Sequence, residues 1–219
     1  MKKILIIGSS GMLGRTAYTY FRQNGYQAVE CTRDVINLAN CNYDELYKHI
    51  KFRKPDIVFN CAGLIVQRKD TSTEDFLHVN SIIPRWLANI CEELDIQMYH
   101  PTTDCIYNGL SGPYEEGIEF SESGIYGISK ALGEPGNCAV IRTSIIGEEK
   151  RNKLSFLEWV RSNKGNTVNG YTNHLWNGVT CLEMCKIIDE IITSDTYYKG
   201  TKHYYAPTVT KADMVEYVN

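Results

Sequence analysis

A tyrosine and a lysine four residues apart are the side chains of this sequence best suited to proton transfer. Tyr126 and Lys130 project from the same face if the segment is a helix, one turn from each other. An ammonium near a phenol stabilises the phenolate, so we expect Lys130 to lower the pKa of Tyr126 and make it an acid or base usable near neutral pH. The spacing also occurs on solvated helix faces, so the pair alone leaves both interpretations open.

A glycine-rich turn near the N-terminus could hold a phosphate group. Residues 8–14 read Gly-Ser-Ser-Gly-Met-Leu-Gly, after an apolar β-branched run at 3–7 and before a helical pattern. In a strand-turn-helix unit Gly8 permits the tight turn, Gly11 lets the backbone approach a pyrophosphate, and Gly14 allows helix and strand to pack closely. The alternative is a plain tight turn, but the position and both flanks favour nucleotide binding.

The choice of cofactor depends on the end of the second predicted strand. Residues 27–31 form that strand, and Thr32, Arg33 and Asp34 follow it, where such folds contact the adenosine ribose. The Arg33 guanidinium suits a 2′-phosphate, which favours NADP(H), whereas Asp34 keeps NAD(H) open. Arg33 could also be a solvated turn residue.

The remaining pattern alternates strands with helices. A third strand at 56–60 ends in Cys61, Ala62 and Gly63, small residues at a strand end where ligands bind in open α/β sheets. We expect a helix from a cap at Ser72 to about Leu94, with its interior Asn80 tied to neighbouring backbone. Further strands are predicted at 97–104, 138–142 and 202–206, and further helices at 42–51, 154–162, 182–192 and 211–219. Polar loops are predicted at 109–117 and 173–180.

This alternation predicts an α/β fold, a Rossmann-type doubly wound parallel sheet with helices on both faces and a small C-terminal lobe. We expect residues 1–150 to form the dinucleotide-binding domain, with the helix and strand of 180–206 packing back on it. Residues 151–219 would then contribute a small, partial substrate-binding lobe.

Composition argues against several other classes of protein. The net charge is −3 without a basic run, which disfavours nucleic acid or an anionic membrane as partner, and no apolar stretch approaches the roughly 20 residues of a membrane span. The eight cysteines lie mostly in apolar segments without a Cys-x-x-Cys, and the five histidines are scattered. These patterns predict reduced thiols, a cytoplasmic protein and no metal site.

Several segments together resemble the extended short-chain dehydrogenases/reductases, and within them the dTDP-4-dehydrorhamnose reductase (RmlD-like) branch. Besides the glycine turn and Tyr126-x-x-x-Lys130, residues 54–62 are similar to the branch's R-P-D-V-V-I-N-C-A, and residues 102–109 to S-T-D-Y-V-F-D-G. Residues 113–116 resemble P-Y-x-E and residues 142–144 resemble R-T-S. The resemblance covers roughly residues 1–210, and the C-terminal part is shorter than usual for the branch.

The resemblance implies a reductase of a 4-keto sugar nucleotide, acting in polysaccharide or surface-glycan biosynthesis. Tyr126 would donate a proton, Lys130 would assist it and hold the nicotinamide ribose, and Thr103 would orient the substrate oxygen. The predicted cofactor contacts are Gly8, Gly11, Met12, Leu13, Gly14, Thr32, Arg33, Asn37, Leu38, Cys61, Ala62, Gly63, Tyr126 and Lys130. The predicted substrate contacts are Thr103, Asp104, Trp176 and Asn177, together with the loop at 108–117.

Two other functions remain open on these residues. One is a sugar-nucleotide epimerase or dehydratase on the same scaffold, and the other is a non-catalytic NADP-binding regulatory subunit. The intact Thr103, Tyr126 and Lys130 oppose the second, whereas the short C-terminal part favours it. Trp176 could equally be an anchor of the small lobe, and a homodimer is one possible assembly.

Overall fold

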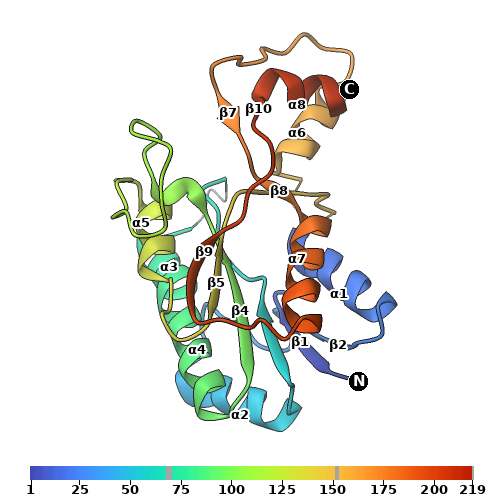
Figure 1. Ribbon diagram of the computed structural model, residues 1–219, viewed down its shortest axis with the longest axis vertical. Coiled ribbons are helices and arrows are strands. Elements are labelled where there is room, and N and C mark those ends of the chain that lie inside the picture. The colour runs from blue at the N-terminus through green and yellow to red at the C-terminus, as the bar shows by residue number, and fades with distance from the viewer. Residues whose placement is uncertain (68–70, 151–152, 219) are drawn as a thin grey trace.

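A six-stranded parallel sheet runs through the centre of the computed structural model, which describes residues 1–67, 71–150 and 153–218 (Figure 1). Its strands are β1 (Lys3–Ile7), β2 (Gln27–Cys31), β3 (Ile57–Asn60), β4 (Gln97–Thr102), β5 (Ala139–Arg142) and β9 (Gly200–His203). Their order is β2-β1-β3-β4-β5-β9, and every neighbouring pair is parallel. This is the predicted Rossmann-type arrangement.

The strand order reverses direction at β1, which pairs with β2 on one side and with β3 on the other. Ile7, the last residue of β1, lies opposite Cys31 of β2 and opposite Asn60 of β3. The three strands therefore end level with one another, so the loops that follow them meet at one edge. Ligands bind at such a switch point in open α/β sheets.

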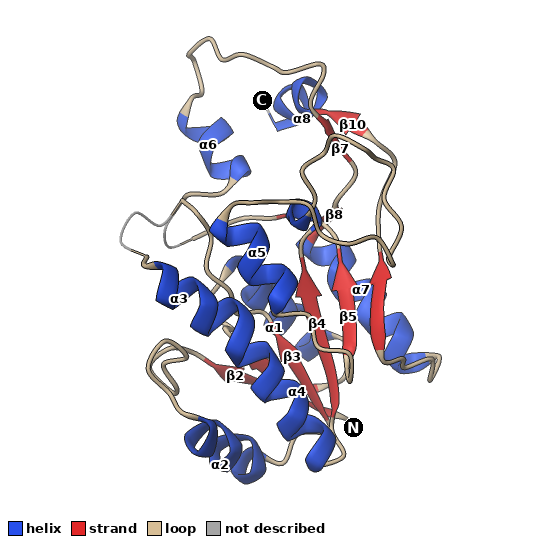
Figure 2. Ribbon diagram, turned by 90° about the vertical axis from the view of Figure 1, so that its left-hand side faces the viewer, coloured by secondary structure: helices blue, strands red, loops and turns tan. Residues whose placement is uncertain are grey.

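Helices cover both faces of the sheet. On one face lie α1 (Met12–Gln23) and α7 (Cys181–Thr193), and their apolar side chains share a core cluster with Phe59 of β3. The other face carries α2 (Tyr43–Arg53), α3 (Thr73–Leu77), α4 (Ile83–Glu93) and α5 (Ile125–Leu132); Figure 2 shows the last three in front of the strands. Strands covered on both sides must be apolar throughout, which is why β1 and β3 read as continuous hydrophobic runs.

The helix predicted from Ser72 is present but interrupted. Ser72 and Asp75 form a reciprocal capping box, and α3 then continues through a π-helical turn, η1 (His78–Ile82), into α4. The turn places Asn80 and Ser81 against α5, as described below. π-turns arise from tertiary contacts more than from local sequence and are frequent at functional sites, so helix periodicity did not predict this one.

A small lobe lies beyond the carboxyl ends of the strands (Figure 1). There β7 (Leu175–Trp176) pairs antiparallel with β10 (Val209–Thr210), and α6 (Phe156–Ser162) contacts α8 (Lys211–Val218). Between lobe and sheet, β6 (Ile145–Ile146) pairs with β8 (Val179–Thr180). The expected polar loop at 173–180 thus contains two short strands, because partners distant in sequence supply hydrogen bonds that the local pattern does not reveal.

The cysteines are free thiols, as predicted, and six of the eight are buried. Cys105 differs: it is exposed, because it lies in the 3₁₀ turn η2 (Asp104–Ile106) that follows β4 and not inside an apolar element. Among the described residues, no helix is both long and apolar enough to cross a bilayer.

Candidate active site

The turn between β1 and α1 has the geometry expected of a phosphate-binding loop. Gly8 has a φ of +75°, and a Cβ at this position would lie 2.9 Å from the backbone of Ala62, so only glycine fits. A Cβ on Gly14 would overlap the Gly8 carbonyl oxygen. Gly11 is exposed, and a Cβ there would meet only the Gly8 oxygen at 3.3 Å. The open side of the turn is therefore at Gly11.

Helix α1 starts at this open side. Within the described residues, no side chain caps its first turn, so the N–H groups there are available to an anion, and the helix dipole favours negative charge. The residues present thus fit the pyrophosphate of a dinucleotide.

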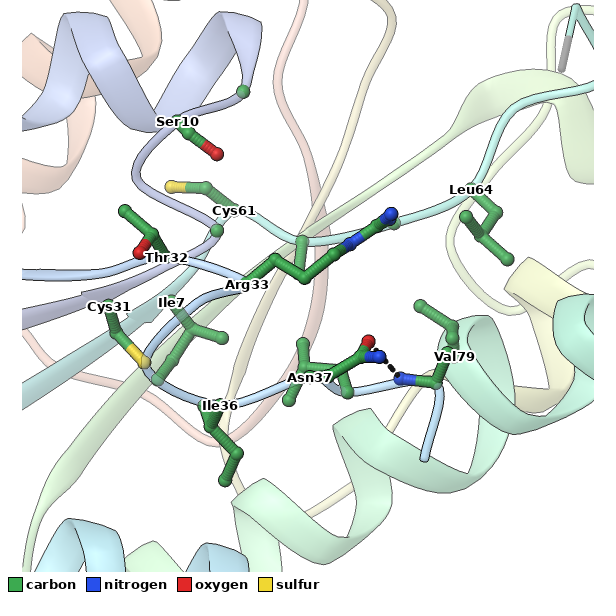
Figure 3. A pocket seen from close by; sticks show the side chains of 16 residues that line it. Ile7, Ser10, Cys31, Thr32, Arg33, Ile36, Asn37, Cys61, Leu64 and Val79 are labelled. Atoms are coloured by element: carbon green, nitrogen blue, oxygen red, sulfur yellow. Dashed lines mark hydrogen bonds between the residues drawn. The ribbon is translucent and has the colours of Figure 1, made fainter. Parts of the chain in front are cut away.

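A first cavity of about 140 Å³ extends from the glycine turn along the ends of β1, β2 and β3. Its lining includes nine predicted cofactor contacts: Gly8, Gly11, Thr32, Arg33, Asn37, Leu38, Cys61, Ala62 and Gly63. Figure 3 shows the Arg33 side chain extending across this cavity toward the side of Leu64, while the Asn37 side chain accepts a hydrogen bond from the Ala39 N–H at 3.2 Å. The cavity is lined by small, polar and aliphatic residues together, a mixture that suits an adenosine end.

A second, larger cavity of about 470 Å³ continues from the first and shares Gly11, Cys61, Ala62, Gly63 and Leu64 with it. Thr103, Tyr126 and Lys130 all line it, as do Met12 and Leu13 of the glycine turn. Thr103 comes from the end of β4, whereas Tyr126 and Lys130 lie on successive turns of α5. The three predicted catalytic residues are therefore brought together beside the predicted cofactor groove.

The π-turn η1 fixes the position of α5. The Asn80 side chain accepts from the Leu64 N–H at 2.8 Å, and its Nδ2 donates to the Leu64 carbonyl oxygen at 3.1 Å and to the Ser129 hydroxyl at 3.2 Å. The Ser81 hydroxyl donates to the Ser129 carbonyl at 2.7 Å, and a Cβ on Gly133 would overlap the Asn80 carbonyl. The predicted structural role of Asn80 is confirmed: it ties the loop after β3 to the helix that carries Tyr126.

The expected lowering of the Tyr126 pKa is wrong for the protein without cofactor. The pKa of the phenol is raised from 10.0 to about 12, mainly by burial; Cys105 and Asp104 also contribute to the rise, and a side-chain interaction with Thr103 opposes it. Lys130 is itself buried, and desolvation lowers its pKa from 10.5 to about 8, partly offset by Glu134. Sequence spacing correctly placed the pair on one helix face but could not reveal that both groups leave water. Tyr126 consequently stays protonated near neutral pH, as a proton donor must.

A buried polar pair behind Lys130 was not predicted. The Asn60 side chain accepts from the Ala62 N–H at 3.2 Å, so its amide nitrogen is the donor to His100 Nδ1 at 3.1 Å. Burial, and then the charge of Lys130, hold the pKa of His100 well below its usual value, so the imidazole is neutral. A single histidine within an apolar strand pattern gives no signal for such a pairing.

Four predicted site residues do not line either cavity. Gly14 lies underneath the turn, and Asp104 accepts a hydrogen bond from the Thr103 hydroxyl at 3.3 Å. Trp176 donates from Nε1 to the Ser144 hydroxyl at 2.8 Å, and Ser144 does line the second cavity. The exposed Asn177 uses its carbonyl to accept from the Ala206 N–H at 2.7 Å. A substrate contact by these residues stays a prediction.

Replacing Gly11 with valine tests the cofactor site, because we expect the variant to lose NADP(H) affinity while the protein still folds. A Cβ on Gly11 meets only the Gly8 oxygen, at 3.3 Å, a contact that a shift of a few tenths of an ångström relieves. We therefore expect the Gly11→Val variant to fold but to weaken NADP(H) binding roughly tenfold or more, because the pyrophosphate loses its close approach to backbone N–H groups. Titration of cofactor fluorescence measures this change. Gly136→Val is a matched control, since a Cβ there meets nothing within 4 Å. Unchanged affinity in a folded Gly11→Val variant would exclude the turn as the pyrophosphate site.

The sheet order, the glycine turn at the switch point and the Tyr-x-x-x-Lys helix beside it together define a Rossmann-type protein of the short-chain dehydrogenase/reductase kind. The profile of the RmlD substrate binding domain family matches residues 1–169, and the chain belongs to that family.

Individual relatives agree with this assignment. The chain is 26% identical over 216 residues to a dTDP-4-dehydrorhamnose reductase of Aggregatibacter actinomycetemcomitans, covering 93% of this chain and 73% of the relative. It is 29% identical over 153 residues to the spore coat polysaccharide biosynthesis protein SpsK of Bacillus subtilis (strain 168), which is 66% of this chain but only 53% of SpsK. A crystal structure of a dTDP-4-dehydrorhamnose reductase from Bacillus anthracis str. Ames in complex with NADP superposes with a TM-score of 0.85 at 18% identity, over 99% of this chain and 79% of that one. The structural likeness shows the shared fold.

Proposed function

We propose that this protein is an NAD(P)H-dependent reductase of a 4-keto deoxysugar nucleotide, similar to the dTDP-4-dehydrorhamnose reductases. The observation that carries the proposal is the convergence of Thr103, Tyr126 and Lys130 on one cavity that is continuous with the groove at the glycine turn. The reductases among its relatives and the polysaccharide biosynthesis protein SpsK support the same substrate class.

The chemistry divides between cofactor and side chains. A bound reduced nicotinamide supplies the hydride for the keto carbon. Tyr126 donates a proton to the carbonyl oxygen, and its raised pKa keeps that proton in place near neutral pH. Thr103 Oγ1 accepts from the Cys105 N–H at 3.1 Å and donates to Asp104 Oδ1 at 3.3 Å. This second hydrogen bond is long, so the hydroxyl proton is able to turn toward the substrate oxygen. The Lys130 ammonium, when charged, favours the developing phenolate.

NADP(H) is the favoured cofactor, with NAD(H) as the alternative. Arg33 extends across the first cavity, where the adenosine ribose of a dinucleotide would lie, whereas Asp34 does not line that cavity. A guanidinium can form charge-assisted hydrogen bonds with a 2′-phosphate, which NADH lacks.

Replacing Arg33 with alanine is expected to change cofactor preference. Loss of a charge-assisted contact should weaken NADPH binding by roughly 10–100-fold and leave NADH binding nearly unchanged. Dissociation constants for the two cofactors, measured side by side, test this expectation. An equal loss for both would show that Arg33 does not contact the 2′-phosphate.

The small lobe closes the substrate end of the second cavity in this proposal. Phe156 of α6 lines the cavity, and Trp176 donates to Ser144, which also lines it, so this side of the lobe is suited to hold the sugar nucleotide. The free cysteines support the cytoplasmic location that the sequence predicts. A homodimer stays one of the assemblies proposed from the sequence.

Cofactor consumption separates the three candidate functions. Purified protein is incubated with NADPH and a panel of 4-keto sugar nucleotides while nicotinamide absorbance is followed. A reductase consumes NADPH in proportion to substrate, an epimerase or dehydratase recycles its cofactor, and a regulatory subunit binds NADPH without turnover. Absence of net consumption across the panel, with cofactor bound, would reject the reductase.

A further inference from the structure

The chain between the two predicted catalytic hydroxyls is long and has little secondary structure of its own. It leaves Thr103, forms the short turn η2, passes an exposed tip at Leu110, and returns to α5 just before Tyr126. We call residues 104–124 the connecting segment. It is the covalent link between the two residues, and it acts on their placement together with the contacts of η1 with α5.

A buried arginine from the sheet holds the middle of this segment. Arg142, at the end of β5, is 6% exposed, and its Nη1 donates to the Tyr107 hydroxyl at 2.7 Å and to the Glu116 carbonyl oxygen at 3.3 Å. Its Nε and Nη2 form a bidentate pair with the Glu134 carboxylate at 3.1 and 2.6 Å. The pair with Glu134 orients the guanidinium, and the remaining N–H groups bind the connecting segment.

The last strand of the sheet completes this cluster. His203 of β9 accepts a hydrogen bond from Arg142 Nη1 at 2.8 Å through its Nε2 atom. Because a guanidinium can only donate, Nε2 carries no proton and the imidazole is neutral. The His203 backbone N–H donates to the Glu116 carboxylate at 3.0 Å. The Tyr107 ring stacks on Tyr114, with centroids 4.2 Å apart. Residues 107–116 are therefore held by β5 and β9.

The same segment is joined directly to the first turn of α5. The Ile106 carbonyl accepts from the Ser121 and Glu122 N–H groups, each at 3.0 Å. The Glu122 carboxylate then accepts from the Ser123 and Gly124 N–H groups at 2.7 and 2.8 Å, immediately before the helix. A displacement at Tyr107 would therefore reach Tyr126 through two adjoining sets of hydrogen bonds.

We propose that Arg142 is a positioning residue, which holds the connecting segment through Tyr107 and Glu116 and thereby sets Thr103 and Tyr126 in the geometry needed for proton transfer. Its role in turnover rests on the proposed function. Arg142 does not line either cavity and so acts through the segment and not on the substrate. Small misplacements of reacting groups are costly to the rate of a reaction.

Two variants test the proposal at different points. Arg142→Lys keeps the positive charge but lacks the planar guanidinium that binds Glu134 and the connecting segment at the same time. Tyr107→Phe removes one hydroxyl and leaves the pair of Arg142 with Glu134 intact. We expect kcat to fall roughly 100-fold in the first and roughly tenfold in the second, with NADPH affinity nearly unchanged. Amide hydrogen exchange should rise in residues 104–124 of both variants but not in β1 or α7.

Arg22→Lys is the matched control, because Arg22 is an exposed arginine on α1 that donates to the Tyr18 hydroxyl at 3.1 Å and lines neither cavity. Increased exchange confined to the connecting segment supports the positioning role even if no sugar nucleotide is turned over, in which case only the proposed function fails. Unchanged exchange there would overturn the proposal. So would exchange that rises equally throughout the sheet, or a normal kcat in variants with a loosened segment.

Discussion

Replacement of Tyr126 with phenylalanine is expected to lower kcat by roughly 10²–10⁴-fold, the range typical of a lost general acid. Tyr126 lines the second cavity from the first turn of α5; phenylalanine keeps its ring and removes only its hydroxyl. Cofactor affinity and the free energy of unfolding should therefore stay close to those of the unaltered protein. Steady-state kinetics with a keto sugar nucleotide at saturating NADPH measure the effect on kcat.

Tyr217→Phe provides the control for this experiment, since Tyr217 is 86% exposed on α8. It should have an unchanged kcat. A Tyr126→Phe enzyme that retains the full rate would remove Tyr126 from the mechanism, and the Tyr-x-x-x-Lys pair would then have only a structural role.

Lys130→Met is expected to reduce activity and cofactor affinity while stabilising the protein without cofactor. The buried ammonium has a pKa of about 8 instead of 10.5, and this shift corresponds to about 3 kcal/mol of unfavourable free energy when the group is charged in the folded state. Below pH 8 both folded and unfolded chains carry the charge, so the full cost is present. Methionine fills a similar volume without the charge.

The stabilisation expected from Lys130→Met depends on pH, because Lys130 titrates at different pH values in the folded and unfolded chains. Between pH 8 and 10.5 the folded chain has released the proton that the unfolded chain still binds, so the stability of the unaltered protein rises with pH in that window. The advantage of Lys130→Met, measured by denaturant unfolding, should therefore be largest near pH 7 and shrink toward pH 10.5. Lys186→Met, at an exposed lysine paired with Glu183, is the control. A constant difference at all pH values would contradict the desolvation argument.

Much of the fold is readable from the sequence because the inner strands are buried on both faces. The apolar run at 3–7 coincides with β1, and the strand predicted at 56–60 contains β3. The cap at Ser72 was recognisable because the capping side chain and its partner Asp75 lie within three residues. The π-turn, β7 and β8 were not recognisable, since each depends on contacts between segments far apart in sequence.

The candidate active site also has features that the sequence predicts and features that it does not. Residues of the glycine turn and the Tyr126 helix were predictable because their spacing reflects local backbone geometry. The pKa values of Tyr126 and Lys130 were not, because burial by surrounding elements decides them. The cluster around Arg142 was visible only as the separate resemblances to R-T-S and P-Y-x-E, and the structure shows that Arg142 of the first motif binds the Glu116 carbonyl of the second.

The mass of the sugar nucleotide after incubation tests the proposed reaction most directly. The protein is mixed with NADPH and a 4-keto sugar nucleotide, and the nucleotide fraction is analysed by mass spectrometry beside a parallel reaction with the Tyr126→Phe variant. A reductase adds two hydrogen atoms to the substrate, so the account predicts a product heavier by that amount, formed in step with NADPH oxidation and nearly absent with the variant. A nucleotide of unchanged mass, or one lighter by a molecule of water, would contradict the account.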